Sequence, residues 1–297
     1  MDMPSNADSP GAVDAAKGPD SPDDAAAPTW RDRPTWQSER AMSFGAIADD
    51  YDRFRPGPPP EAARWVLGVR PGRVLDLGAG TGGLTRQVST LTSTVYAAEP
   101  DERMRAVLVD RTPGVRAVGA RGEALPFATG SLDAVVVSSA WHWMDPAIAV
   151  PEVARVLRPG GVFGLLWNGP DRRVEWVSEL LERRRRFERP PRDAASPGRP
   201  RWAAPDLAPD APFLAPEATV VRWSRRATAE DLAGLAGTYS SVITFGPGRR
   251  QTMEARTADI AARHPELFTD GAVELPFACR CWRAVRTADP VARLLGG

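Results

Sequence analysis

The stretch "VLDLGAGTGGLT", residues 74–85, runs from an apolar, strand-like segment straight into a loop with almost no side chains. A glycine-rich turn between a strand and a helix offers backbone N–H groups to a ligand and allows the ligand to approach the main chain closely. Gly78, Gly80 and Gly83 also satisfy the G-x-G-x-x-G spacing shared by proteins that bind NAD. The stretch therefore predicts a ligand site with free N–H groups in the turn, and it leaves the kind of ligand open.

Strand-like and helix-like segments alternate along most of the chain. Strands are expected at residues 72–78, 93–100, 115–120, 132–140, 161–168, 218–224 and 272–285. Helices are expected at residues 82–91, 101–111, 146–161, 174–188, 228–243 and 249–268. This alternation predicts an α/β fold built on a doubly wound, mostly parallel sheet of seven strands, with a Rossmann-like arrangement.

The first part of the chain differs in composition from the rest. Residues 1–42 are rich in Asp, Ala, Pro and Ser and lack periodic apolar positions, which predicts a disordered tail. We expect a single domain over residues 43–297. Its core is expected at residues 61–168, and its C-terminal part, residues 169–297, is expected to carry a helical insertion.

Composition restricts the partners and the compartment. The 297 residues include 38 basic and 38 acidic side chains, so the chain lacks the basic excess typical of nucleic-acid-binding proteins. No apolar run approaches the ~20 residues that span a bilayer, and no signal peptide is recognised, so we expect a cytoplasmic protein without a membrane partner.

Cys279 and Cys281 should point to one face of a strand. Two cysteines alone predict neither a disulfide framework nor a metal site.

Three features distinguish between the possible ligands of the glycine loop. A carboxylate at Asp76, two residues before Gly78, would repel a pyrophosphate and suits a ligand with an ammonium or sulfonium charge. Glu99 ends the next strand, where an acidic residue receives the hydroxyls of a ribose. The segment "GEALPF", residues 122–127, would supply backbone N–H groups and apolar walls for an adenine ring. Together these features describe S-adenosylmethionine better than NAD.

Five motifs in order give the chain a family resemblance: "VLDLGAGTGGLT", "AAEPDERM", "GEALPF", "SLDAVVVSSAWHWMD" and "VARVLRPGGVFGLLWN". With them the chain resembles the class I S-adenosylmethionine-dependent methyltransferases, in their small-molecule branch, over residues 43–168. "YDRFRPG" and "AWHWMD" resemble in addition a bacterial subgroup related to the trans-aconitate methyltransferases. The resemblance implies S-adenosyl-L-methionine as the cofactor and a last strand that inserts antiparallel into the sheet.

The resemblance also implies which residues bind each part of the cofactor. They are Asp76, Gly78 and Gly80, with Ala79 between them, and the carbonyl of Ser138 for the methionine part; Glu99 for the ribose; and Pro100, Met104, Gly122 and Glu123 for the adenine. Arg121 stands where many family members have a small or acidic residue, so no adenine contact is assigned to it.

The residues that bind the methyl acceptor are expected in "SSAWHWMD", residues 138–145, because open α/β sheets place their ligand sites just beyond the strand ends. His142 is the candidate catalytic residue, as a general base or a substrate contact; the alternative is a histidine that hydrogen-bonds the scaffold. In an extended segment Trp141 and Trp143 would share one side. Trp141 is then a candidate substrate residue, and core packing is favoured for Trp143.

A helix near the start of the domain provides the remaining candidates. Ser43 is a possible N-cap, and Phe44, Ile47 and Tyr51 follow on one helical face. The resemblance implies that this part folds over the cofactor as a lid, so Tyr51 and Arg55 are candidate substrate residues, Arg55 for a carboxylate. Packing for Tyr51 and solvation for Arg55 are the alternatives.

The sequence thus predicts a methyltransferase that acts on a small molecule, with O-methylation of a carboxylate or a secondary metabolite as the leading form. Displacement at an activated sulfonium needs alignment and a dry site more than a strong base. An NAD-dependent oxidoreductase and a non-catalytic S-adenosylmethionine-binding protein are the alternatives. The acceptor and the oligomeric state are not predicted.

Overall fold

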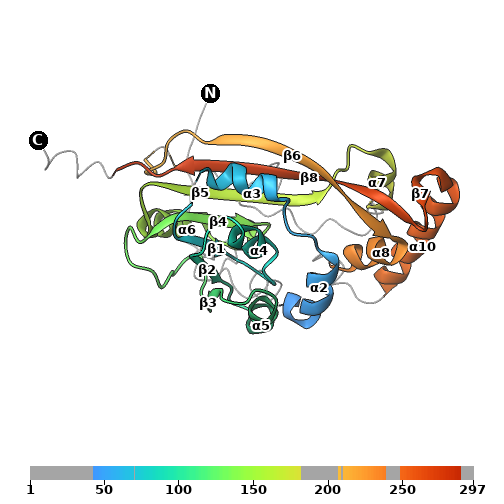
Figure 1. Ribbon diagram of the computed structural model, residues 1–297, viewed down its shortest axis with the longest axis horizontal. Coiled ribbons are helices and arrows are strands. Elements are labelled where there is room, and N and C mark those ends of the chain that lie inside the picture. Colours follow the sequence, from blue (N-terminus) through green and yellow to red (C-terminus); the bar gives the residue numbers. More distant parts are fainter. Residues whose placement is uncertain (1–42, 70, 182–206, 209, 239–247, 289–297) are drawn as a thin grey trace, which may run out of the picture. The chain divides into compact units, whose positions relative to one another are not determined.

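The computed structural model describes residues 43–69, 71–181, 207–208, 210–238 and 248–288, and all of them belong to one compact unit (Figure 1). The tail expected at residues 1–42 lies outside the described residues. Among the described residues, no helix is both long enough and apolar enough to cross a bilayer.

One mixed sheet organises the described chain. Its strands are β1 (Val74–Leu77), β2 (Val95–Ala98), β3 (Arg116–Val118), β4 (Leu132–Ser138), β5 (Leu157–Pro170), β6 (Glu217–Thr228), β7 (Phe268–Thr269) and β8 (Ala272–Val285). They are ordered β3-β2-β1-β4-β5-β8-β6, and the two-residue β7 pairs with β8. Strands β1 to β5 are parallel, and β8 inserts antiparallel between β5 and β6. The predicted mostly parallel sheet with an antiparallel last strand is confirmed, with β7 as a short eighth strand.

Helices connect the strands and cover both faces. They are the 3-10 helices η2 (Ser43–Ile47), η3 (Trp141–Trp143) and η4 (Pro265–Leu267), and the α-helices α2 (Ala48–Phe54), α3 (Pro60–Leu67), α4 (Gly83–Ser89), α5 (Glu102–Arg111), α6 (Pro146–Val156), α7 (Glu175–Leu180), α8 (Ala229–Gly237) and α10 (Gly248–Arg263). Local sequence explains where several begin. Asp101 caps α5 by accepting from two backbone N–H groups, and Asp145 caps α6, with Pro146 in the first turn.

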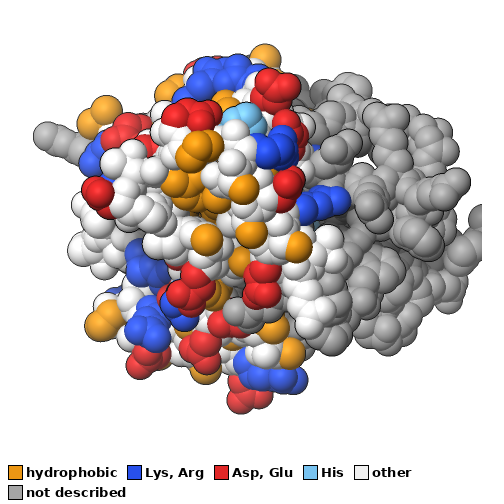
Figure 2. Space-filling view, turned by 90° about the vertical axis from the view of Figure 1, so that its right-hand side faces the viewer, with side chains coloured by type: hydrophobic (Ala, Val, Ile, Leu, Met, Phe, Trp, Pro, Cys, Tyr) orange, Lys and Arg blue, Asp and Glu red, His pale blue; other side chains and the backbone are white. Residues whose placement is uncertain are grey.

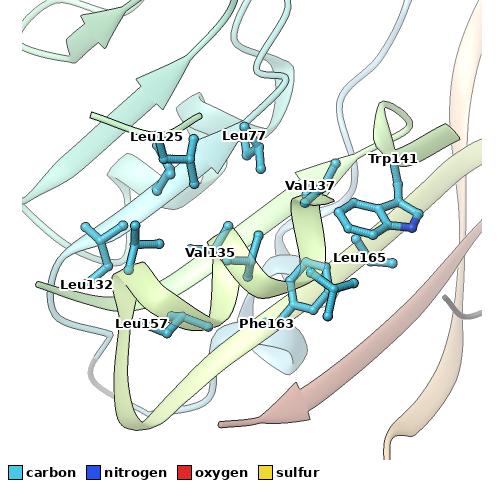
Figure 3. Close-up of a cluster of buried hydrophobic side chains, with 14 of the residues drawn as sticks. Leu77, Leu125, Leu132, Val135, Val137, Trp141, Leu157, Phe163 and Leu165 are labelled. Atoms are coloured by element: carbon cyan, nitrogen blue, oxygen red, sulfur yellow. The ribbon is translucent and has the colours of Figure 1, made fainter. Parts of the chain in front are cut away.

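Alternate strand positions point into two apolar clusters on opposite faces of the sheet. On one face α3 and α4 pack with Val74, Val136 and Leu166. On the other face α6 packs over a cluster that includes Val135 and Phe163 (Figure 3). Burial on both sides explains why the parallel strands read as continuous apolar runs.

The two cysteines lie on the α3 face of β8. Cys279 and Cys281 are buried free thiols whose Sγ atoms are 3.8 Å apart. Their predicted position on one face is confirmed. In the described part of the chain, no three His, Cys, Asp or Glu side chains gather in a way that could hold a metal ion.

A third apolar cluster lies at one end of the long strands. There α7, α8 and α10 pack against the ends of β6 and β8 around Leu232, Ile260 and Phe277. The face that carries these helices mixes acidic and basic side chains around a small apolar area (Figure 2). Neither sign of charge dominates the described residues on that face.

The structure differs in several places from what the sequence suggests. The helix expected at residues 146–161 ends at Val156, because Leu157 is already extended and pairs with β4. The first helix is divided at Ile47 into η2 and α2, although the rings of Phe44 and Tyr51 still meet, with centroids 5.6 Å apart. Residues 141–143 form a 3-10 turn rather than an extended segment, so their side chains do not alternate in direction.

Candidate active site

The glycine loop follows β1 at the carboxyl edge of the sheet. Gly78, Gly80 and Gly82 have φ angles of 69°, 57° and 91°, values that glycine adopts without the strain of a side chain. Gly78 is also crowded, because a Cβ atom there would lie 2.6 Å from Cβ of Ala140. The sequence therefore needs glycine here for both the turn and the close approach of the segment after β4.

The N–H groups of this loop are used inside the protein. Gly78 and Ala79 donate to the carbonyl oxygen of Ala98 at 2.8 and 3.1 Å. Gly80 donates to Oε2 of Glu99 at 2.8 Å. The expectation of free N–H groups in this turn is therefore wrong for these three residues, because Ala98 at the end of β2 and Glu99 directly after it accept their hydrogen bonds. Such a loop is poorly suited to hold a phosphate, which needs several unsatisfied N–H groups.

Asp76 lies in β1 directly below the loop and is fully buried. Its Oδ2 accepts a hydrogen bond from the Thr85 hydroxyl at 2.6 Å, whereas Oδ1 is buried and has no hydrogen-bond partner in the described residues. Burial raises the pKa of Asp76 to about 7, and the negative charge of Glu99 adds to the rise. A buried carboxyl with an unused oxygen beside a second carboxyl fits a positively charged ligand.

Glu99 follows β2 and is 8% exposed. Its Oε2 accepts from Gly80, and its Oε1 accepts from the N–H of Asp101 at 2.9 Å. Burial raises the pKa of Glu99 despite these two hydrogen bonds. Each carboxylate oxygen has two lone pairs, so each retains the capacity to accept from a hydroxyl group. The side chain therefore joins the glycine loop to the start of α5 and can still receive a ribose.

The residues expected around the adenine lie on both sides of the loop. Met104 is buried in α5, and its Cε lies 3.5 Å from the position of a Cβ on Gly80. Pro100, which precedes α5, is half-buried. Gly122 is buried, and Oε1 of Glu123 accepts from the N–H of Asp145 at 2.8 Å. The Glu123 carboxylate is thus directed toward the start of α6.

Met144 joins this group, although the sequence analysis did not select it. Its Sδ lies 2.7 Å from the position of a Cβ on Gly122, and its Cε lies 3.4 Å from that of Gly78. One thioether therefore packs against glycines from two separate motifs. In the sequence, the glycines at positions 78 and 122 indicate that a neighbouring side chain packs closely there, but they do not indicate which one.

The chain beyond β4 divides between the core and the site. Ser138 ends β4 half-buried, and Ser139 has a φ of 56°. Trp141 then turns into the core: it is 6% exposed, and its ring packs edge-on against Phe163 with centroids 5.2 Å apart (Figure 3). Core packing was expected for Trp143, but Trp141 is the tryptophan that packs into this cluster.

Half-buried side chains from two parts of the chain meet at η3. The ring of Trp143 lies 4.4 Å from His142 and 6.1 Å from Phe44, measured between centroids. Phe44 contacts Tyr51, and the Arg55 guanidinium lies over the Tyr51 ring at 5.5 Å. We call these five residues the aromatic wall. The contacts form one row, in which Arg55 and Tyr51 lie at one end, His142 lies at the other, and Phe44 and Trp143 lie between them.

Close contacts hold the segment η2–α2 against the cofactor motifs. Asp52 pairs with Arg86 of α4 at 2.7 Å, and both side chains are half-buried. A Cβ on Gly45 would lie 2.5 Å from the Asp101 carboxylate oxygens. At the end of the segment, the Asn168 amide donates to the carbonyl oxygens of residues 56 and 57 at 3.1 and 3.0 Å. The segment that carries Phe44, Tyr51 and Arg55 is therefore held against α4 and the start of α5, the two helices that follow β1 and β2.

Comparisons with known proteins agree on one family. The family model described as "Methyltransferase domain" matches residues 75–165. An uncharacterized methyltransferase of Mycobacterium tuberculosis is 39% identical over 246 residues, which cover 83% of this chain and 96% of the relative. An uncharacterized methyltransferase-like protein of Schizosaccharomyces pombe is 28% identical over 78% of this chain and 91% of its own length. A solved structure from Anaeromyxobacter dehalogenans, proposed to be a type II methyltransferase, is 26% identical, with a TM-score of 0.53 over 78% of this chain and 98% of the other.

Proposed function

Because the chain belongs to the class I S-adenosylmethionine-dependent methyltransferases, we propose that it methylates an oxygen atom of a small molecule bound at the aromatic wall. Membership in this family also removes the NAD-dependent oxidoreductase from consideration. The acceptor class, the methylated atom and the residue roles below are part of this proposal.

The cofactor would bind across the carboxyl ends of β1 and β2. Asp76 would face its positively charged methionine part, next to Gly78, Ala79, Gly80 and the carbonyl of Ser138. Glu99 would accept from the ribose hydroxyls, and the adenine would lie among Pro100, Met104, Gly122 and Glu123. The unused Oδ1 of Asp76 supports this arrangement most directly, because a cationic ligand would satisfy it and lower the cost of its ionisation. S-adenosylmethionine itself supplies an activated methyl group.

The contact between Phe44 and Trp143 carries the proposal of a small acceptor. It joins the N-terminal segment η2–α2 to the turn after β4. In this proposal the two segments together cover the edge of the sheet where the methyl group is expected. An enclosed site excludes water and favours alignment, and it disfavours a large polymer as the acceptor. Three aromatic rings favour a partner with a flat or apolar portion.

His142 and Arg55 define two forms of acceptor. For a hydroxyl acceptor, His142 would take the proton as the oxygen attacks the methyl carbon. For a carboxylate acceptor, no base is needed, and the guanidinium of Arg55 would align the charged group. The hydroxyl and the carboxylate would each attack through an oxygen atom. His142 and Arg55 both belong to the aromatic wall.

Formation of S-adenosylhomocysteine over a panel of acceptors tests the proposal. The panel contains small carboxylic acids, phenols and alcohols, matched amines, and RNA and protein preparations. We expect turnover with at least one small oxygen nucleophile, and methyl ester or ether products by mass spectrometry. Transfer only to nitrogen or carbon would contradict O-methylation, and transfer only to RNA or protein would contradict the small-molecule acceptor.

A further inference from the structure

Helix α6 holds the segment 121–127 through one pair of side chains. Glu152 Oε1 accepts from the N–H of Leu125 at 2.7 Å. Arg155 donates to the carbonyl oxygens of Leu125 and Phe127 at 3.1 and 2.9 Å. The two side chains thus satisfy one donor and two acceptors of the same short backbone segment.

Glu152 and Arg155 also hold each other in a fixed geometry. Nε of Arg155 donates to Oε2 of Glu152 at 2.8 Å, and Nη2 donates to Oε1 at 2.7 Å. This bidentate pairing fixes both planar groups, and hydrogen bonds that involve charged groups are stronger than neutral ones. The hydrogen bonds from Arg155 hold the pKa of Glu152 below its ordinary value, so the carboxylate stays ionised near neutral pH.

The same helix contacts the segment at a second point. The N–H of Asp145, the cap of α6, donates to Oε1 of Glu123. Residues 123, 125 and 127 are therefore all tied to one helix. That helix follows η3, which carries His142 and Trp143. Gly122 lies at the start of the tied stretch and packs against Met144.

A second ion pair in the chain shows what such a pair looks like without this role. Glu61 and Arg64 have the same i, i+3 spacing, but their closest N–O distance is 3.8 Å and their side chains are 66% and 58% exposed. The Glu152 and Arg155 side chains are 17% and 37% exposed. An exposed pair contributes little, whereas a pair that also satisfies partly buried backbone groups is more costly to remove.

We propose that Glu152 and Arg155 are positioning residues that fix segment 121–127 in the conformation that recognises the adenine base, and so set the selectivity of the enzyme for that base. The inference rests on the proposed role of Gly122 and Glu123 at the adenine. Neither side chain needs to touch the cofactor. Their effect is to prevent the backbone of the segment from shifting when a base with a different hydrogen-bonding edge is offered.

The test compares S-adenosylhomocysteine with S-inosylhomocysteine by titration calorimetry. In the inosine analogue an acceptor nitrogen of the base becomes an N–H donor, and the amino group becomes a carbonyl. The variants are Glu152→Gln, which removes the charge, and Arg155→Lys, which keeps the charge but cannot reach both carbonyls while pairing bidentately. Glu61→Gln is the matched control, because it makes the same chemical change in a pair of the same spacing.

We expect Glu152→Gln to bind S-adenosylhomocysteine about tenfold more weakly, as for the loss of one charge-assisted hydrogen bond, with a smaller loss for the inosine analogue. The preference for adenine should therefore shrink in this variant and in Arg155→Lys, and should be unchanged in Glu61→Gln. Unfolding curves identify any variant that fails to fold, and the other variant then decides.

An unchanged preference in folded Glu152→Gln and Arg155→Lys proteins would overturn the inference and leave the cofactor site intact. A wild-type protein that binds both analogues equally would instead overturn the adenine role of segment 121–127, and the inference with it. Both results are independent of the identity of the methyl acceptor.

Discussion

The backbone N–H of Gly80 donates to Oε2 of Glu99 at 2.8 Å, so the glycine loop after β1 and the acid after β2 form one hydrogen-bonded unit. Glu99 uses its other oxygen to accept from Asp101, which caps α5. A single buried carboxylate thereby holds two cofactor motifs together before any ligand binds. Its loss should affect stability and cofactor affinity at once.

Replacing Glu99 separates these two effects. Glu99→Gln keeps an acceptor oxygen for one backbone N–H, whereas Glu99→Ala leaves two donors without their partner and should destabilise the protein by about 1–3 kcal/mol. Both variants should bind S-adenosylmethionine about 10- to 100-fold more weakly if the carboxylate receives two ribose hydroxyls. Urea unfolding and calorimetry measure the two quantities, and wild-type affinity in a folded Glu99→Ala protein would contradict the ribose role.

The pKa of Asp76 predicts a pH dependence for cofactor binding. Burial raises this pKa to about 7 in the ligand-free protein, so the carboxyl is largely neutral below that pH. A cationic ligand prefers the ionised form, and its affinity should fall by up to about tenfold for each pH unit below 7. Calorimetry with S-adenosylmethionine from pH 5.5 to pH 8.5 gives the profile. In Asp76→Asn the affinity should be low and the profile flat; a variant profile as steep as that of the wild type would rule out Asp76 as the titrating group.

The same group predicts an opposite trend for the stability of the ligand-free protein. The folded protein holds the Asp76 proton more tightly than the unfolded chain, because the folded pKa is about 7 and the ordinary value is 3.8. The contribution of Asp76 to stability is therefore greatest below pH 4 and is lost progressively as the pH rises to 7. Relative to wild type, Asp76→Asn should gain about 2 kcal/mol between pH 5 and pH 8. Equal pH slopes for both proteins in urea unfolding would refute this.

Much of this arrangement was predictable from local patterns. The alternation of apolar runs with amphipathic segments indicated the sheet, and the places of Asp76 and Glu99 at two strand ends indicated the charged site. Other features depend on the packing of distant segments. The loop N–H groups are occupied because β2 lies beside β1, and Trp141 is in the core because residues 141–143 form a tight turn. Neither fact has a signature in the spacing of residues.

Met144 is the residue that packing alone revealed, and a double mutant tests its role. Gly122→Ala would place a Cβ 2.7 Å from the Met144 Sδ, so the flexible thioether must move. We expect cofactor affinity to fall about tenfold in Gly122→Ala and to recover in part in Gly122→Ala with Met144→Ala, since contacting residues are not additive. Calorimetry on the four proteins of the cycle gives the coupling. Strict additivity would mean that Met144 does not transmit the effect of the new methyl group.

Replacing either of the two tryptophans that flank His142 by alanine should have different consequences. Trp141 is 6% exposed and packs on Phe163, so Trp141→Ala should cost about 3–5 kcal/mol of stability through the cavity that it leaves. Trp143 is half-buried in the aromatic wall, so Trp143→Ala should cost less than about 2 kcal/mol and should raise the KM of the acceptor about tenfold or more. Cofactor affinity should stay near the wild-type value in Trp143→Ala, because the proposed wall faces the acceptor. Urea unfolding and steady-state kinetics with the acceptor found in the panel provide the comparison. A Trp143→Ala enzyme with an unchanged KM would remove this side chain from the acceptor site, and the small-molecule proposal would then lose the contact that carries it.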